Sequence, residues 1–261
     1  MRVLTRFAPA PTGYLHLGHV VNALYVWGTA QERGGQVLLR IEDHDRQRSR
    51  PEYAAAILDD LAWLGFVPDG AIVRQSERDA IYRKALQPLI DHELVYACTC
   101  SRNEIHGERY ANTCREKEIP LTEGVSWRVR MEPGVERFFD ELLGPQEQDP
   151  SLQCGDLLVR DRLGNWSYQF AATVDDHLQR ISDVIRGVDL LASTGRQIRL
   201  ARMLGRVTPP RFWHHPLVMK SPTQKLSKSD GDSGIRDLRE AGWTAEQVLA
   251  KARDLSGNLR P

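Results

Sequence analysis

The first 43 residues alternate between strand-like and helix-like patterns, and this alternation restricts the fold more than any other feature of the sequence. The β-prone segment VLTRFA (3–8) leads into a proline-rich turn, and apolar residues then recur at helical spacing over residues 15–33. A second, buried strand, QVLLRIED (36–43), follows Gly34 and Gly35. This order predicts a βαβ unit, which requires a parallel sheet with a right-handed crossover. Ligands of such sheets bind at the carboxyl ends of the strands.

The length and composition exclude several classes of protein. At 261 residues and 29.6 kDa, the chain has room for one large domain or two small ones with a real core. The sequence has no apolar stretch of roughly 20 residues and no apolar run like that of a signal peptide. We therefore expect a cytoplasmic protein that does not bind a membrane. The 35 basic residues balance the 35 acidic ones, so any contact with RNA has to be local. Nothing in the sequence indicates a dimer surface, and we expect a monomer.

The middle of the chain interrupts the alternation of helices and strands. Pro51 opens a helical pattern, and Ser76 is expected to cap a further helix that Pro88 kinks or splits. From about Tyr96 to Asn165 the sequence is irregular, with the short strand-like segments WRVRM and LLVRD between acidic connections. The later elements that we expect are a helix over 168–179, a strand over 183–189, a helix over 190–204, a strand over 213–218, a polar loop over 220–234 and a helix over 243–255.

This interruption indicates an α/β sheet domain that is discontinuous in sequence. A module inserted between two halves of the sheet explains why the alternation stops and then returns. The expected parts are the first half of the sheet domain at 1–95, the inserted module at 96–165, the second half at 166–220, and a loop with a short helical segment at 221–261.

The segment His16-Leu17-Gly18-His19 lies where the turn after the first strand becomes the first helix. A helix start offers N–H groups and the positive end of the helix dipole, which suit a phosphate, and Gly18 would let a nucleotide approach the backbone. The two histidines lie three residues apart and therefore share one face of the helix. A surface helix that carries two histidines, or a pair of metal ligands, would produce the same pattern.

The second motif, KLSKS, contains Lys225 and Lys228 in a loop bordered by Pro222, Gly231 and Gly234. Two lysines on such a loop can close over a triphosphate and neutralise the charge that builds on a leaving pyrophosphate. Taken alone, the segment is explained more simply as a basic loop exposed to solvent. Its position about 200 residues after the histidine motif, on an α/β chain, favours the nucleotide-binding interpretation.

HLGH and KLSKS resemble the HIGH and KMSKS signatures of class I aminoacyl-tRNA synthetases. The segments RFAPAPTGYLHLGH, LLRIEDHD and VDDHL are similar to those of glutamyl-tRNA synthetases, so the resemblance extends from Arg6 to about Ser229. It implies a Rossmann-like catalytic domain with a parallel sheet, an inserted zinc-bearing module and a short helical C-terminal segment. The chain stops shortly after KLSKS, where those enzymes continue into an anticodon-binding region, so it is more similar to the truncated glutamyl-Q tRNA(Asp) synthetases.

The resemblance also implies a glutamate pocket. Two carboxylates and one ammonium group call for cations together with an anion. The residues that match the family's pocket are Arg6, Ala8, Ala10, Glu42, Tyr168 and Arg186. Arg6 and Arg186 would hold carboxylates, Glu42 would accept from the ammonium group, and Tyr168 would contribute its hydroxyl. Two positions depart from the pattern: the family often has Ser in place of Ala10, and glutamyl-tRNA synthetases commonly have Asn in place of Ala172.

Three cysteines lie close together in the inserted module. Cys98, Cys100 and Cys114 could supply three thiolates to a tetrahedral structural Zn²⁺, which needs one further ligand. Spacing alone makes His106 as suitable as Tyr110, whereas the resemblance implies Tyr110. Three ordinary thiols in a reducing cytosol remain the simpler alternative. Cys154 stands apart, and we expect no metal at it.

The resemblance implies a two-step reaction with ATP, Mg²⁺ and L-glutamate. His16, Gly18 and His19 would hold the phosphates while Lys228, helped by Lys225, stabilises the departing pyrophosphate. The glutamyl-adenylate would then react with the queuosine base of tRNA(Asp). The alternatives are a minimal glutamyl-tRNA synthetase that charges a tRNA 3′ end, a non-catalytic RNA-binding module derived from a synthetase, and another nucleotidyltransferase that activates a small acid.

Two further groups of polar residues receive no catalytic role. Asp175, Asp176 and His177 could form an acid–base group, but the resemblance implies that this segment is architectural. His214 and His215 stand beside Trp213, and the sequence does not distinguish a place near the nucleotide from a place in the core.

Overall fold

The computed structural model describes residues 2–105, 107, 109–221, 224–225 and 234–256. The chain forms two compact units, each assembled from segments that are distant in sequence. Unit 1 consists of Met1–Gln75, Ile181–Leu190 and Arg211–Pro261, and unit 2 consists of Ser76–Arg180 and Leu191–Pro210.

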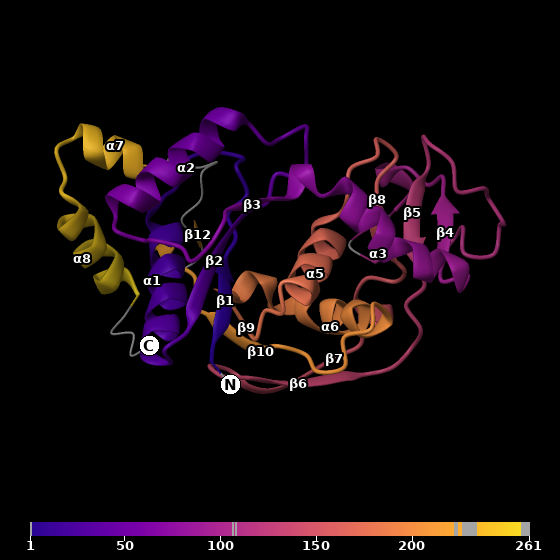
Figure 1. The fold of residues 1–261 in the computed structure, drawn as a ribbon. Coiled ribbons are helices and arrows are strands. Elements are labelled where there is room, and N and C mark those ends of the chain that lie inside the picture. The colour runs from indigo at the N-terminus through magenta and orange to yellow at the C-terminus, as the bar shows by residue number, and fades with distance from the viewer. Residues whose placement is uncertain (1, 106, 108, 222–223, 226–233, 257–261) are drawn as a thin grey trace. The chain divides into compact units, whose positions relative to one another are not determined.

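Unit 1 contains the βαβ arrangement that the first residues predict (Figure 1). Its three initial elements are β1 (Leu4–Phe7), α1 (Leu17–Glu32) and β2 (Gln36–Ile41). The strands are parallel, with Leu4 opposite Gln36 and Phe7 opposite Leu39. The remaining parallel strands of the unit are β3 (Val73–Arg74) beside β2, and the pair β9 (Asp183–Gly187) and β10 (Arg211–His215). The backbone N–H of Ser182 donates to the carbonyl of Leu4 at 2.8 Å, so β9 runs beside β1.

The helices of unit 1 bury apolar faces in one core. These helices are α1, α2 (Pro51–Trp63), α7 (Ile235–Glu240) and α8 (Ala245–Leu255). Val26 of α1, Ile57 of α2 and Val248 of α8 are all fully buried in this core. The expected polar loop at 220–234 is wrong in part, because Met219–Ser221 (β11) and Gln224–Lys225 (β12) pair as antiparallel strands. The rest of that segment lies outside the described residues.

Unit 2 combines helices with antiparallel strands. Its main sheet has the order β4-β5-β8 and includes both strand-like segments seen in the sequence. The elements of the unit are α3 (Asp79–Asp91), β4 (Val95–Cys98), β5 (Ser126–Val129), β6 (Glu136–Asp140), β7 (Gly144–Gln148), α4 (Pro150–Gln153), β8 (Leu157–Arg160), α5 (Tyr168–Leu178) and α6 (Thr194–Met203). Strands β6 and β7 form a hairpin that the sequence analysis did not identify.

One expectation about α3 is wrong, and one of the two alternatives for Pro88 is excluded. Ser76 does not cap this helix, because residues 75–77 form a 3-10 turn and the N-cap is Arg78, which makes no side-chain cap hydrogen bond. Pro88 does not split the helix, which continues to Asp91. Only three residues follow Pro88, so little helix lies beyond the turn where its missing N–H weakens the hydrogen bonding.

The limits of the two units differ from the expected domain limits at 95/96 and 165/166. Helices α3 and α5 belong to unit 2 because their apolar faces pack against its sheet. Tyr82 and Leu86 of α3 share a buried cluster with Val129, Val159 and Phe170. Among the described residues, no helix is both long and apolar enough to cross a lipid bilayer.

Candidate active site

A pair of histidines starts helix α1 in unit 1. His16 is the N-cap residue, and its Nδ1 accepts from the backbone N–H of Gly18 at 3.1 Å. The Nδ1 of His19 in turn accepts from the backbone N–H of His16 at 3.1 Å, and the two ring centres are 3.9 Å apart. Because each Nδ1 accepts, the proton of each neutral ring is on Nε2. The turn thus offers two Nε2–H donors at the positive end of a helix dipole.

Gly18 is required by the position of the His16 ring. A β-carbon at residue 18 would lie 2.9 Å from Cε1 and 3.0 Å from Nδ1 of His16. No ordinary contact is that short, so any side chain at this position would displace the ring. The sequence predicts that Gly18 lets a nucleotide approach closely, and the position of the His16 ring gives a second, local reason for glycine here.

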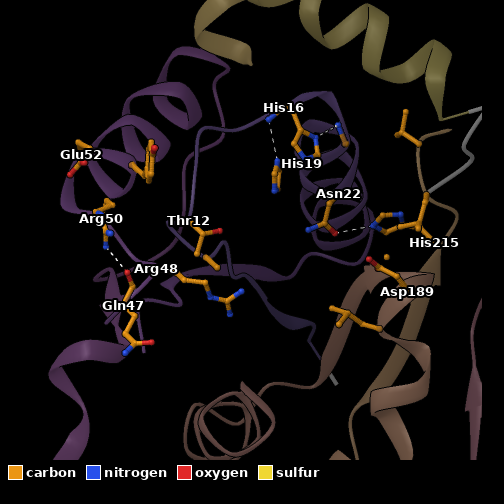
Figure 2. A pocket seen from close by; sticks show the side chains of 17 residues that line it. Thr12, His16, His19, Asn22, Gln47, Arg48, Arg50, Glu52, Asp189 and His215 are labelled. Atoms are coloured by element: carbon orange, nitrogen blue, oxygen red, sulfur yellow. Dashed lines mark hydrogen bonds between the residues drawn. The ribbon is translucent and has the colours of Figure 1, made fainter. Parts of the chain in front are cut away.

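A cavity of about 1160 Å³ opens beside the histidine turn (Figure 2). It lies at the carboxyl ends of β1, β2, β9 and β10, where ligands of parallel sheets bind. Figure 2 shows Thr12 and Arg48 on one side of it, and His19, Asn22 and His215 on the other. Its lining residues are Ala10, Thr12, His16, Gly18, His19, Asn22, Gln47, Arg48, Arg50, Glu52, Tyr53, Gly187, Asp189, Leu190, His215, Leu217 and Val218.

Three of the residues predicted to bind glutamate are buried near the same strand ends. Arg6 is in β1 and donates to the carbonyl of Ile185 at 3.5 Å. Glu42 directly follows β2, and Arg186 in β9 donates through Nε to Nε2 of His214 at 3.0 Å. Each of the three residues is at most 6 % exposed, so their charges act in a poorly solvated environment.

Arg40 is a functional candidate that the sequence analysis missed. It is fully buried in β2, and its guanidinium donates to Glu42 at 3.1 Å. The signal was present, because residues two apart on a strand face the same side. Arg40 supplies a positive charge beside the carboxylate that was predicted to receive an ammonium group.

The other predicted glutamate residues occupy different settings. Ala10 is exposed and lines the cavity, whereas Ala8 is half-buried. Tyr168 is the first residue of α5 in unit 2, and its part in a glutamate pocket stays a prediction. Ala172, on the same helix, is buried.

His215 lies in the cavity wall rather than deep in the core. Its ring stacks on Tyr25 with centres 4.3 Å apart, its Nδ1 lies 2.9 Å from the carbonyl of Pro216, and its Nε2 lies 3.0 Å from Oδ1 of Asn22. Burial lowers the pKa of His215, although its hydrogen bond to Pro216 acts in the opposite direction. The sequence left open whether His215 lies near the nucleotide or in the core, because a β-strand pattern does not show which of its residues borders a ligand site.

The predicted lysines of the KLSKS motif are outside the part of the chain whose side chains are described. Lys225 belongs to β12, and Lys228 lies beyond it. Their roles, and that of Mg²⁺, therefore stay predictions.

The cysteine cluster of unit 2 brings its donor atoms together. The sulfur atoms of Cys98, Cys100 and Cys114 lie within 4.8 Å of one another, and Cys100 and Cys114 are 3.5 Å apart. The hydroxyl of Tyr110 lies 3.3 Å from the sulfur of Cys98 and 3.9 Å from that of Cys100. A tetrahedral zinc ion with Zn–S bonds of about 2.3 Å separates its ligand atoms by about 3.5–3.8 Å. These four residues therefore fit a structural zinc site.

The acidities of two of these groups differ sharply. Burial raises the pKa of Cys114, but hydrogen bonds from Thr99, Tyr110 and Cys100 outweigh it and lower the pKa to about 6. Burial and the hydrogen bond with Cys98 raise the pKa of Tyr110. Cys114 is thus preset as a thiolate, whereas Tyr110 would lose its proton only to a metal ion. His106, the alternative ligand, lies outside the described residues, and Cys154 is not part of the cluster.

In the segment Asp175-Asp176-His177, Asp175 makes structural contacts. The carboxylate of Asp175 is fully buried and accepts from Nε of Arg78 at 2.7 Å and from the hydroxyl of Tyr82 at 2.9 Å. These contacts join α3 to α5 within unit 2.

Comparison with known proteins identifies the family of the chain. The family described as tRNA synthetases class I (E and Q), catalytic domain, matches residues 2–132 and 115–255, which together span nearly the whole chain. This chain belongs to that family. The class I synthetases of this family are ligases of the aminoacyl-tRNA synthetase type, and the mixed α/β fold of the chain is that of their catalytic domain.

Individual members of the family resemble the chain over most of its length. It is 45% identical to the glutamyl-Q tRNA(Asp) synthetase of Bordetella bronchiseptica, over 87% of this chain and 75% of that protein. It is 36% identical to glutamate–tRNA ligase 1 of Syntrophus aciditrophicus, over 95% of this chain and 54% of that protein. The crystal structure of a glutamate tRNA ligase from Elizabethkingia meningosepticum, in complex with its amino acid, superposes with a TM-score of 0.77 at 30% identity over 89% of this chain. The present chain covers 53% of the length of that glutamate tRNA ligase.

Proposed function

We propose that this protein activates L-glutamate with ATP and transfers the glutamyl group to the queuosine base of tRNA(Asp). The observation that carries the first part is the arrangement at one edge of the unit 1 sheet, where the His16–His19 turn borders a large cavity and Arg6, Glu42 and Arg186 are buried at neighbouring strand ends. ATP requires hydrogen-bond donors for its phosphates, and an amino acid with two carboxylates requires both positive and negative side chains.

In the first step, an oxygen of the glutamate α-carboxylate attacks the α-phosphorus of ATP. The bond from that phosphorus to the bridging oxygen breaks, and pyrophosphate leaves. The Nε2–H groups of His16 and His19 donate to phosphate oxygens, while Lys225 and Lys228 stabilise the leaving group. Mg²⁺ that accompanies ATP would supply further positive charge to this step.

The buried charges orient the amino acid during this step. Arg6 and Arg186 bind carboxylate oxygens, and Glu42 accepts from the ammonium group. Arg40 donates to one oxygen of Glu42 and so holds this carboxylate in place. A contribution of the Tyr168 hydroxyl to glutamate binding is part of the same proposal. No protein nucleophile is needed, because the carboxylate of the substrate makes the attack.

In the second step, a hydroxyl of the queuosine cyclopentenediol attacks the carbonyl carbon of glutamyl-adenylate. An ester forms, and AMP leaves with the electrons of the broken C–O bond. Support for this acceptor comes from relatives that are named glutamyl-Q tRNA(Asp) synthetase, one of them 45% identical to this chain. The proposed partners are therefore ATP, L-glutamate and tRNA(Asp) that carries queuosine. We propose that the protein acts as a monomer.

The proposal includes a structural zinc ion held by Cys98, Cys100, Tyr110 and Cys114. The spacing of their donor atoms supports it, and so does the acidity of Cys114. Such an ion would fix the segment between β4 and β5, and it has no role in the reaction.

Incorporation of labelled glutamate tests the proposed function. The acceptors are tRNA(Asp) with queuosine, the same tRNA without queuosine, and tRNA(Glu), each with ATP and Mg²⁺. Label on the queuosine-bearing tRNA alone is expected. Removal of the 3′-terminal adenosine from this tRNA should leave the label unaffected.

The alternative enzyme function is charging of a tRNA 3′ end, which the similarity to glutamate–tRNA ligases favours. Label on tRNA(Glu) that depends on an intact 3′ end would establish it. A chain that shows no ATP–pyrophosphate exchange with any amino acid would instead be a non-catalytic RNA-binding module.

A further inference from the structure

The short helix α7 contacts the segment that leads into the histidine turn. The backbone N–H of Ile235 donates to the carbonyl of Leu15 at 2.8 Å, and Gly234 forms an antiparallel bridge with His16. The guanidinium of Arg236 lies over the ring of Tyr14, 5.6 Å from its centre, and donates to its hydroxyl at 3.3 Å. The first turn of α7 is therefore joined to the residues directly before the catalytic histidines.

At the other end of α7, the guanidinium of Arg239 contacts three side chains of α2. Nη1 of Arg239 lies 2.5 Å from a carboxylate oxygen of Asp59 and 2.9 Å from one of Asp60, and its guanidinium carbon lies 4.9 Å from the ring centre of Trp63. Asp60 is only 2 % exposed, so its charge is compensated by protein groups rather than by water. Figure 1 shows α7 beside α2.

Helix α2 also borders the active-site cavity. Glu52 and Tyr53 in its first turn line the cavity, and the ring of Tyr53 meets that of Tyr14 edge to face at 4.9 Å. Tyr14 is thus held between the first turn of α2 and Arg236 of α7. Three parts of unit 1, namely α2, α7 and the turn before α1, constrain one another around this tyrosine.

We propose that Arg239 is a positioning residue, which holds α7 on α2 and thereby keeps the His16–His19 turn in place for the reaction. Arg239 lies three residues beyond Arg236, on the next turn of the same helix, so a shift of α7 is passed directly to Leu15 and His16. A displacement of about 1 Å in groups that position a substrate can slow a reaction by orders of magnitude. This inference rests on the proposed activation of glutamate with ATP.

Loss of Arg239 has two separable effects. It leaves the carboxylate of Asp60 buried without its cation, which destabilises the fold, and it releases α7 from α2. An Asp60→Asn/Arg239→Met double variant removes the buried charge as well as the cation. Its thermal unfolding midpoint should therefore recover toward that of the unsubstituted protein, while α7 stays released.

The kinetic test uses ATP–pyrophosphate exchange with glutamate. For Arg239→Met we expect kcat to fall about tenfold and KM for glutamate to change less than about twofold, because the substrate-binding residues are untouched. Arg239→Lys should retain most of kcat, since one nitrogen of Arg239 contacts both carboxylates. Arg253→Met, at an exposed arginine of α8, is the matched control. Recovery of kcat together with stability in the double variant would overturn the proposal.

A second measurement does not depend on activity. Long-range ¹H–¹⁵N spectra of the histidine side chains report which ring nitrogen carries the proton and what it contacts. The signals of His16 and His19, assigned with His16→Gln and His19→Gln, should shift in Arg239→Met and in the double variant but not in Arg253→Met. Unchanged signals would overturn the inference. A lack of exchange by the unsubstituted protein would instead contradict the proposed function alone.

Discussion

At the scale of single residues, the histidine turn depends on the absence of a side chain at residue 18. We expect Gly18→Ala to lower ATP–pyrophosphate exchange by about tenfold or more, because the new β-carbon would displace the His16 ring. Stability should change by less than about 1 kcal/mol, since the loss of the His16 cap and the higher helix propensity of Ala oppose each other.

Parallel measurement of exchange and thermal unfolding checks this prediction. Gly28→Ala, in the same helix α1, is the control and should leave exchange unchanged. Normal exchange by Gly18→Ala would show that the ring position seen here is not needed for the reaction.

A second residue-scale prediction concerns pH. Burial lowers the pKa of His215, so the unfolded chain binds a proton there at a higher pH than the folded chain does. The free energy of unfolding should therefore be greatest above about pH 6.5 and should fall as the pH drops below it. Unfolding midpoints between pH 5 and 8 measure the effect, and His215→Gln should make the dependence shallower.

Burial also lowers the pKa of His177, which should make stability depend on pH in the same way as His215 does. His177→Gln is therefore needed as a comparison. If His215→Gln and the unsubstituted protein lose stability equally on acidification, the loss comes from other groups.

At the scale of elements, the segment between β4 and β5 should depend on zinc. We expect one equivalent of zinc in the purified protein and in Cys154→Ser, and less than about a tenth of an equivalent in Cys114→Ser. Tyr110→Phe should bind zinc more weakly, by about 10- to 100-fold, because a water molecule would have to replace the phenolate. Metal analysis and titration with a chromogenic chelator give these values. Full affinity in Tyr110→Phe would assign the fourth ligand elsewhere.

The sequence predicted the elements of unit 1 well where local signals were strong. The β1–α1–β2 order, α2 after Pro51 and α8 after Thr244 carry clear periodicity with start signals. Helix α7 was missed because six residues are too few to show a helical period. The cap of α3 was misplaced because Ser76 begins a sequence that looks like a capping motif, yet a 3-10 turn comes first.

The site was predictable only where a motif marks it. His16, His19 and the cysteine cluster stand in recognisable patterns, and the structure brings each group together. Arg40 and Asn22 carry no motif, and their contacts with Glu42 and His215 arise from strand geometry and from tertiary packing. Arg239 is similar, because its partners lie about 180 residues earlier in the chain.

At the scale of the whole molecule, the cavity belongs to unit 1 and the cysteine cluster to unit 2. A non-hydrolysable ATP analogue at about one hundred times its Kd should stabilise the unit that binds it by about 2.7 kcal/mol. We therefore expect hydrogen exchange to slow by up to about 100-fold in α1, β9 and β10, with much less change in β4 and β5. Equal protection of both sets of amides would contradict independent opening of the two units.

The division of unit 1 into three segments has a consequence for the synthesis of the protein. The β1–α1–β2 unit leaves the ribosome first, but β9, which runs beside β1, follows only after residues 76–180 have been made. At ordinary rates of translation, this interval lasts on the order of ten seconds. Throughout it, the nascent sheet has an open strand edge of the kind that pairs with other chains. We therefore expect the chain to be most prone to aggregation before β9 pairs with β1, at a stage that the finished fold no longer reveals.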